Sequence, residues 1–485
     1  MQRRCAGDRR ACGCVNAPPS GAVLGRARAR SAHRFPVWLT AASIAAAAAT
    51  MFLPAAIASA PADTPPSAAD AAIATLASPA LRRDTEGQIA STGGSPGDSL
   101  RVFLMTMGPG PAVWERFGHN AIWIHDPVAG TDRAYNYGLF SFAQEGFIRR
   151  FIKGRMEYWM GYDDAYLTVE AYRRAGRSVW VQELNLTPEQ KVELRDFLEW
   201  NALPENTFYR YDYYRDNCST RVRDAIDRVL DGRLKSTTTG VMTGTTYRSH
   251  TRQLTGSDYP IYAGLLLAMG HPVDAELSVW EEMFLPMKLM EHVRSATVVD
   301  AEGREAPLVI AEQPLFLAAD GDDPERGPPL VAFLMIGLVV GGMLAGAGAA
   351  ARRSRVGEIA FVALAGVWML VVGVLGAVIS GLWLFTDHYV AFRNENVLQV
   401  HPVWLVTGAL VLAGGFGIAR AAQLARGLTL VLAALAVAGV ILQIVPALDQ
   451  ANGEILALMV PATLGLAWGI AQWSRTSVAN SGRAR

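Results

Sequence analysis

Long apolar runs separated by short polar connections fill the C-terminal part of the chain. A run of about 20 apolar residues is long enough to cross a bilayer as an α-helix. The runs lie at residues 330–351, 357–385, 403–419, 428–446 and 455–473. We therefore predict a five-helix transmembrane domain over residues 330–475 and a short cytoplasmic tail over residues 476–485.

The N-terminal segment has the pattern of a targeting sequence. Residues 1–35 are rich in arginine, which predicts a basic cytoplasmic tail, and residues 36–60 are apolar and end in Ala58-Ser59-Ala60. This pattern is typical of a signal peptide cleaved after Ala60 or of a signal anchor that stays in the membrane. Both alternatives place the chain from residue 61 onward outside the cytoplasm. Residues 61–98 are rich in small residues and proline without an apolar period, which predicts a flexible linker.

Residues 99–315 have the shorter apolar segments of an ordinary globular domain. The alternation of apolar and polar positions predicts strands over residues 99–107, 121–125 and 133–140. The segment Thr187-Pro188-Glu189-Gln190 combines a capping box with a proline in the first turn, which predicts a helix that runs to about Asn201. Strands mixed with helices indicate an α+β domain, and residues 316–329 are the expected linker to the membrane helices.

Composition and charge indicate where the protein is located. Only 18% of the residues are charged, against about 25% in a typical soluble protein. The formal net charge of +0 gives no sign of nucleic-acid binding. If the sides alternate along the chain, the arginine-rich connections 352–355 and 420–426 are cytoplasmic, whereas 386–402 and 447–454 are outside. The positive-inside rule therefore predicts a bacterial inner-membrane protein whose globular domain is periplasmic.

Cys218 is the lone cysteine of the predicted periplasmic domain, because Cys5, Cys12 and Cys14 lie in the N-terminal tail. A disulfide within that domain is therefore impossible. A free thiol in an oxidising compartment is exposed to damage and needs a physical reason. On composition alone, a buried structural cysteine and a functional one are about equally expected.

The positions after Cys218 predict a helix that begins at this residue. The apolar stripe of that helix is Cys218, Val222, Ala225, Ile226 and Val229. Asp216 or Asn217 would then be the N-cap, and Gly232 would supply the C-terminal stop. The free N–H groups and partial positive charge of a first helical turn favour a thiolate and can hold an oxyanion.

His119 is the predicted general base. Gly118 permits a tight turn directly before it, so we expect His119 at the mouth of the second strand. A histidine in hydrogen-bond reach of a thiol takes its proton, and its ring nitrogen would lie within about 4 Å of the sulfur. Papain/NlpC-like enzymes use this pair, here with histidine before cysteine as in their permuted members.

Several alternatives stay open around this pair. The histidines that share the periplasmic domain and could replace His119 are His125, His250, His271 and His292. The candidates for orienting His119 or holding the oxyanion are Asn120, Tyr137, Asp216, Asn217 and Asp274. No spacing typical of metal ligands is present, so we predict no metal and no cofactor.

The candidate residues belong to motifs that occur in a fixed order along the chain. The motifs are Phe117-Gly118-His119, Tyr135-Asn136-Tyr137-Gly138, Asp216-Asn217-Cys218-Ser219-Thr220-Arg221, Met283-Phe284-Leu285-Pro286 and Phe385-Thr386-Asp387-His388. Together they resemble the Lnb-type lipoprotein N-acyltransferases. The resemblance implies transfer of an acyl chain from a phospholipid donor, through a thioester on Cys218, to the N-terminal amine of a diacylated lipoprotein. It also implies that Cys218 is the nucleophile and His119 the general base.

The predicted outside loop 386–402 is unusually polar for a connection between membrane helices. His388, Asn394 and Asn396 are therefore candidates for contact with a lipid headgroup or the acceptor. A solvated loop without a function is an equal alternative.

Two other functions fit the same residues. A membrane-tethered cysteine peptidase or amidase would use Cys218 and His119 on cell-wall or envelope peptides. A non-enzymatic envelope protein would merely bury Cys218. Five further helices favour access to lipid, because a peptidase needs only one anchor, and a position at a helix start beside Asp216 and Asn217 argues against simple burial.

Overall fold

The computed structural model describes residues 96–299, 303–319, 321–322 and 327–483. The predicted basic tail, signal segment and nearly all of the first linker lie outside these residues. The soluble part is built on a seven-stranded sheet with the order β11-β5-β1-β2-β3-β4-β6, in which all neighbours are antiparallel. Its strands are β1 (Arg101–Met107), β2 (His119–Asp126), β3 (Thr131–Leu139), β4 (Glu157–Asp164), β5 (Val179–Leu184), β6 (Phe208–Arg210) and β11 (Val309–Phe316).

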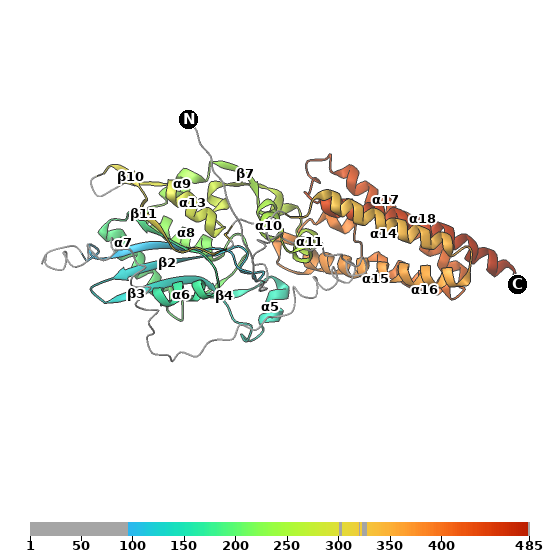
Figure 1. The fold of residues 1–485 in the computed structure, drawn as a ribbon, viewed down its shortest axis with the longest axis horizontal. Coiled ribbons are helices and arrows are strands. Elements are labelled where there is room, and N and C mark those ends of the chain that lie inside the picture. The colour runs from blue at the N-terminus through green and yellow to red at the C-terminus, as the bar shows by residue number, and fades with distance from the viewer. Residues whose placement is uncertain (1–95, 300–302, 320, 323–326, 484–485) are drawn as a thin grey trace, which may run out of the picture. The chain divides into compact units, whose positions relative to one another are not determined.

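The central strand β1 is buried on both faces, which explains its continuous apolar sequence. Val102 and Leu104 belong to a core with α7 (Pro188–Asn201), α8 (Cys218–Val229) and α13 (Pro286–Ser295). Phe103 and Met105 belong to a second core on the other face, which α6 (Ala165–Arg174) covers. Figure 1 shows α6 and the three helices on opposite sides of the sheet. The fold is therefore a three-layered α+β domain, as the alternation of strands and helices predicted.

The two predicted helices of this domain are confirmed at their starts. Thr187 and Gln190 form the expected capping box of α7. Asn217 caps α8 by accepting from the backbone N–H of Thr220 at 2.9 Å, so Cys218 is the first helical residue. Leu230 is the C-cap of α8, and Gly232, with φ +76°, takes part in the stop as predicted, because its N–H donates to the Asp227 carbonyl of α8 at 2.9 Å; it also precedes the next helix.

Shorter elements complete the soluble part. They are α5 (Phe147–Lys153), α9 (Arg233–Thr238), β7 (Met242–Thr246), α10 (Tyr247–Thr255), α11 (Tyr259–Ala268), η1 (His271–Asp274), β8 (Glu276–Ser278), α12 (Val279–Glu282), β9 (Thr297–Val299) and β10 (Glu305–Pro307).

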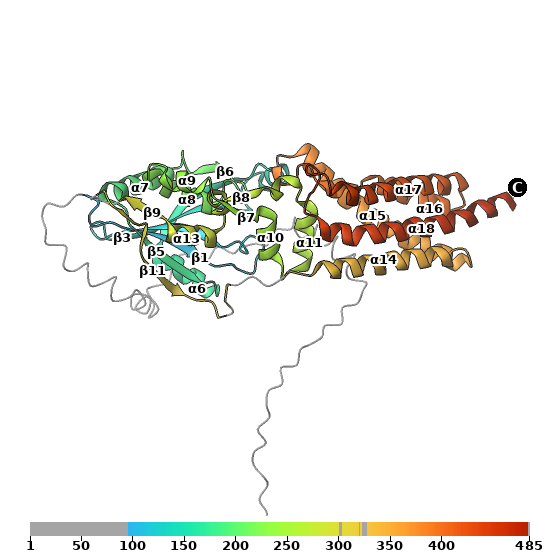
Figure 2. The same cartoon turned by 90° about the horizontal axis from the view of Figure 1, so that it is seen from above.

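Five helices of the described residues are long and apolar enough to cross a membrane, the third of them counted together with the short turn before it. The spans begin at Leu330, Arg355, Glu395, Ala419 and Gly453. Their helices are α14 (Leu330–Ala350), α15 (Arg355–Phe385), α16 (Val403–Gly415), α17 (Ala419–Leu442) and α18 (Gly453–Arg483). They lie side by side in Figure 2. Arg355 donates to the carbonyl of Gly415 at 3.3 Å, so the start of α15 and the end of α16 meet at the arginine-rich, predicted cytoplasmic side.

The outside loop 386–402 caps a helix of the soluble domain. Asn394 Nδ2 donates to the carbonyls of Leu267 (2.9 Å) and Ala268 (3.0 Å). Asn396 Nδ2 donates to the carbonyls of Leu266 and Leu267, both at 3.1 Å. These are the last carbonyls of α11, which lack partners within the helix. Both asparagines are fully buried, so the loop joins the membrane helices to the soluble domain.

We expect Asn396→Ala to loosen α11, because the buried Leu266 carbonyl then keeps only a 3.5 Å contact with Arg248 Nη1, and a buried carbonyl without a close donor costs about 1–3 kcal/mol. Hydrogen–deuterium exchange of the α11 amides should become faster in detergent-solubilised protein. Asn185→Ala, which removes an exposed side-chain bond to the Pro307 carbonyl, is the control. Unchanged protection of α11 in Asn396→Ala would contradict this account of the loop.

Candidate functional site

The start of α8 is anchored to β2 by one buried hydroxyl. The single hydroxyl hydrogen of Ser219 is shared between Asn120 Oδ1 and the carbonyl of Met283, each 2.8 Å from Ser219 Oγ. Asn120 Nδ2 in turn donates to Thr106 Oγ1 at 2.9 Å. Ser219, Asn120 and Thr106 are all fully buried. This chain of bonds fixes Cys218, the residue before Ser219, beside the first residues of β2.

The sulfur of Cys218 lies where β2 and β3 separate. The paired positions of these strands end at Ala121 and Asn136. Beyond them, the backbone N–H groups of Asn120, Ser219 and Cys218 act on the thiol and favour its charged form. Gly138, with φ +86°, follows on β3, and a Cβ built on it would lie 3.4 Å from Cys218 Cβ. The sulfur therefore has backbone donors of the kind that form an oxyanion hole.

Cys218 is a protonated thiol at neutral pH. Burial raises its pKa to about 11, although the three backbone N–H donors and the charge of Arg177 act in the opposite direction. The start of the helix favours a thiolate, as expected, but removal from water outweighs this effect. The side chain is still only half-buried, so a reagent can reach it.

His119 is held by an amide whose orientation is determined. Asn136 Nδ2 donates to the carbonyl of Ala134 at 3.0 Å, so the other amide atom, Oδ1, faces His119 Nε2 at 3.1 Å. An amide oxygen only accepts, so Nε2 carries the proton and Nδ1 is the basic nitrogen. No hydrogen bond among the described residues joins His119 directly to Cys218, so the catalytic pair stays a prediction.

The surroundings of His119 keep its ring neutral. Tyr172 of α6 stacks on it with ring centroids 6.4 Å apart, and the guanidinium of Arg177 lies over Tyr172 at 4.6 Å. Burial lowers the pKa of His119 to about 4, the bond to Asn136 raises it, and the charge of Arg177 lowers it. Because the imidazole is unprotonated near pH 7, it is able to accept a proton.

The other four histidines considered as partners of Cys218 all contact carboxylates. The pairs are His125 with Asp132, His250 with Glu282, His271 with Asp449 and His292 with Glu282. His119 differs from them because its partner is a neutral amide, the kind of group that orients a histidine without charging it.

Comparison with known families supports the sequence resemblance. Residues 90–253 match the family model of the Lnb N-terminal periplasmic domain, a stretch that includes His119, Asn136 and Cys218. The soluble domain is of the Lnb type. No curated protein and no solved structure matches the chain. With its apolar helices, the protein is an inner-membrane protein that carries an Lnb-type domain in the periplasm.

The Lnb-type domain places the remaining candidates in different surroundings. Tyr137 donates a 2.7 Å bond to Asn201 Oδ1, and Asp216 forms an ion pair with Arg221, with 2.7 Å between Asp216 Oδ2 and Arg221 Nη2. Asp274 pairs with the buried guanidinium of Arg248, whose Nη2 lies 3.0 Å from Asp274 Oδ2. Their side chains therefore bond to groups other than His119 and Cys218.

Asn120 and Asn217 hold the backbone around Cys218 in place. The backbone N–H of Asn120 meets the sulfur while its side chain holds Ser219, and Asn217 caps α8. In the membrane loop, His388 Nε2 lies 2.9 Å from the Phe151 carbonyl and the ring stacks on Tyr213. The loop candidates Asn394 and Asn396 bond to the last carbonyls of α11.

Sequence reasoning did not assign roles to three residues beside the pair, namely Asn136, Tyr172 and Arg177. For Asn136, the strand pattern of the β2–β3 hairpin could have indicated its position beside His119. In the antiparallel register, Asn136 faces Ala121, two residues from His119 on the same face of the sheet. Tyr172 and Arg177 gave no comparable signal, because they reach the site only through the packing of α6.

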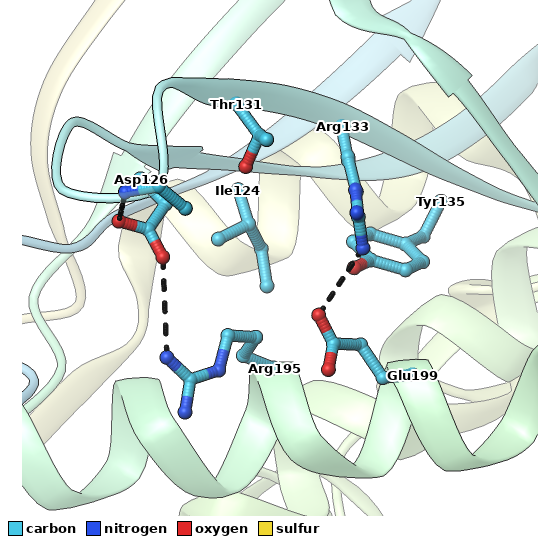
Figure 3. A pocket seen from close by; sticks show the side chains of 8 residues that line it. Ile124, Asp126, Thr131, Arg133, Tyr135, Arg195 and Glu199 are labelled. Carbon is cyan, nitrogen blue, oxygen red and sulfur yellow. Dashed lines mark hydrogen bonds and ion pairs between the residues drawn. The ribbon is translucent and has the colours of Figure 1, made fainter.

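A separate pocket lies at the far end of the hairpin β2–β3 (Figure 3). Its volume is about 190 Å³, and Arg195 and Glu199 of α7 form its floor. Glu199 contacts Arg133 at 3.2 Å. Strands rise about 3.3 Å per residue, so this pocket lies roughly 20 Å from His119 and has no part in its chemistry. The described residues hold no group of three or more His, Cys, Asp or Glu side chains that could bind a metal.

We expect alkylation of Cys218 by iodoacetamide to accelerate about tenfold per pH unit from pH 7 towards pH 11, because only the thiolate reacts. Mass spectrometry of the Cys218 peptide measures the rate separately from the other cysteines. In denaturant, the pH at which the alkylation rate reaches half of its maximum should fall to about 8.5, the pKa of an exposed thiol. If the alkylation rate of the folded protein reaches half of its maximum at about pH 8.5 or below, the thiol is not desolvated.

Proposed function

We propose that the protein is a thiol-dependent acyltransferase that moves a fatty acyl chain from a phospholipid to the N-terminal amine of a diacylated lipoprotein. The Lnb-type domain indicates an enzyme of the transferase class. The observation that carries the proposal is the tautomer of His119, whose Nδ1 is left basic by Asn136, in a domain whose Cys218 is a protonated thiol. A neutral thiol and a neutral imidazole are the reactants of general-base catalysis.

In the first half-reaction, Cys218 attacks the ester carbonyl of the phospholipid. His119 Nδ1 takes the thiol proton while the S–C bond forms. The ester C–O bond then breaks, and His119 returns the proton to the glycerol oxygen, which leaves as a lysophospholipid. The backbone N–H groups at Cys218, Ser219 and Asn120 are the donors available to the developing negative charge.

In the second half-reaction, the amine of the acceptor attacks the thioester. The N–C bond forms, the C–S bond breaks, and the amine proton passes through His119 back to the sulfur. Because the pKa of the Cys218 thiol is high, the sulfur is protonated at the end of the cycle. The protonated thiol does not react again until a new ester binds.

The geometry supports a permuted papain/NlpC-like catalytic unit over residues 99–315. Such a unit needs a nucleophile at the start of a helix, a histidine on a strand under that helix, and an oxygen that orients the histidine. Cys218 on α8, His119 on β2 and Asn136 on β3 fit these roles, with histidine first in the chain. Residues 316–329 then link this unit to the membrane domain 330–475.

The surface of α5 supports a lipid donor. Its C-terminal turn binds the residues that directly follow the membrane helix α15, since Asp387 N–H donates to the Lys153 carbonyl at 2.9 Å. Ile148 and Ile152 are 46% and 47% exposed on one side of α5. Arg149 and Lys153 are also exposed. An apolar stripe flanked by cations at the end of a membrane helix is suited to the interface of a phospholipid bilayer.

We expect purified protein incubated with acyl-labelled phospholipid to form a hydroxylamine-sensitive adduct on Cys218. Cys218→Ser and His119→Ala should each abolish the adduct, because one lacks the thiol and the other lacks the base, while circular dichroism shows a folded domain. Cleavage of cell-wall peptides without any adduct would instead favour the tethered peptidase or amidase. Absence of both activities would favour the non-enzymatic alternative.

The double variant Ile148→Ser with Ile152→Ser should form the adduct at least about tenfold more slowly from bilayer phospholipid, because burying such side chains is worth about 1.5–3 kcal/mol each. Acylation by a soluble short-chain ester should be unchanged. Leu167→Ser, which changes an exposed leucine on α6, is the control. An equal loss with both donors would show that α5 supports the fold rather than the lipid contact.

A further inference from the structure

The hydroxyl of Tyr209 is buried without a hydrogen-bond partner among the described residues. Tyr209 lies on β6, opposite Tyr158 of β4, at the edge of the sheet nearest the start of α8. Tyrosine hydroxyls removed from water normally have a partner. Tyr137, which touches the Tyr209 ring edge-on, satisfies this rule through its bond to Asn201. The unpaired hydroxyl of Tyr209 therefore needs an explanation.

This hydroxyl and Cys218 both border the space that a side chain at Gly138 would occupy. The position that a Cβ on Gly138 would occupy lies 3.8 Å from Tyr209 Oη and 3.4 Å from Cys218 Cβ. The ring of Tyr211 is the third neighbour of that position, at 3.6 Å. A group of methyl size at that position would meet all three neighbours at ordinary van der Waals distances. Gly138 keeps this space open, since any other residue would put a side chain there.

The ring of Tyr209 is held firmly in this position. The guanidinium of Arg221 lies over it at 4.2 Å, and Asp216 fixes that guanidinium in turn. Burial raises the pKa of Tyr209 well above its ordinary value, and ionisation of Cys218 raises it further. The hydroxyl therefore stays protonated, and it is able to donate a hydrogen bond throughout a reaction at the sulfur.

We propose that Tyr209 donates its hydroxyl hydrogen bond to the carbonyl oxygen of the acyl group on Cys218, and that Gly138 keeps open the space for that oxygen. The inference rests on the proposed acyl transfer and adds a side-chain donor to the backbone donors at Cys218. The bond strengthens as the carbonyl becomes a tetrahedral oxyanion, so it lowers the barrier of both half-reactions. No proton leaves Tyr209 in either step.

The decisive variant is Tyr209→Phe, which removes only the hydroxyl. Formation of the acyl adduct on Cys218 should slow by about 100-fold, the usual effect of losing one oxyanion donor. Alkylation of Cys218 by iodoacetamide should keep the wild-type rate, because that displacement has no oxyanion. Tyr162→Phe, which removes the hydroxyl of an exposed tyrosine on β4, should leave both rates unchanged.

A second pair of variants tests the space itself. Gly138→Ala and Gly130→Ala place a side chain at similar left-handed positions, φ +86° and +66°, but a Cβ on Gly130 meets nothing within 4 Å. Both variants bear the same kind of backbone strain. Only Gly138→Ala should slow acylation, by about 100-fold if the carbonyl is displaced by about 1 Å.

The outcomes separate this inference from the proposed function. If the wild type forms an adduct and Tyr209→Phe forms it equally fast, the role of Tyr209 is refuted and acyl transfer stands. If Tyr209→Phe slows alkylation as much as acylation, the residue only supports the structure around Cys218, and the inference is also refuted. If the wild type forms no adduct, the proposed function itself fails.

Discussion

The site depends on the hydrogen bond between Ser219 and Asn120. It joins the first turn of α8 to the first residues of β2, and both side chains are removed from water. Such a bond contributes modestly when made, but leaving either group buried without its partner is costly, so the two elements have one stable register. That register brings Cys218 to the backbone N–H of Asn120, the residue that follows His119 in the chain. Without it, a helix start and a strand end would be two unrelated features.

The electrostatics of the site follow from burial. A thiol with a pKa of about 11 and an imidazole with a pKa of about 4 are both neutral over the physiological range. A neutral thiol is a poor target for oxidants, which suits an unpaired cysteine in the periplasm. Because thiol and imidazole are both neutral at rest, the proposed transfer of the thiol proton waits until an ester carbonyl is in place. The charge of Arg177, separated from His119 by the ring of Tyr172, helps to keep the imidazole unprotonated.

The contact between the soluble domain and the membrane helices also depends on buried polar groups that need hydrogen-bond partners. The open carbonyls at the end of α11 receive the amides of Asn394 and Asn396 from the loop between two membrane helices. A helix end buried without partners would be destabilising, so the soluble domain and the loop depend on each other. Close by, Asp387 forms ion pairs with Arg155 and Arg210 at 2.7 and 3.1 Å. These contacts hold α5 beside the end of a membrane helix.

Local patterns in the sequence were enough to predict the membrane helices, the α+β character of the soluble domain, and a capped helix that begins at Cys218. Apolar period, capping residues and loop charge each act over a few residues, so each can be read without the fold. The surroundings of His119 could not be predicted in this way. The register of β2 with β3 decides that Asn136 orients it, and the packing of α6 decides that Tyr172 and Arg177 surround it.

The charge state of Cys218 could not be predicted from the sequence for the same reason. A helix start favours a thiolate, but the degree of burial, which only the assembled sheet and helices determine, outweighs it. Asn394 and Asn396 looked like residues for a substrate until the structure showed the carbonyls that they bind. The sequence by itself determined which chemical groups the chain possesses and where its helices begin. The tertiary structure alone decided which of those groups meet, and how far each is removed from water, because both depend on contacts between residues distant in the chain.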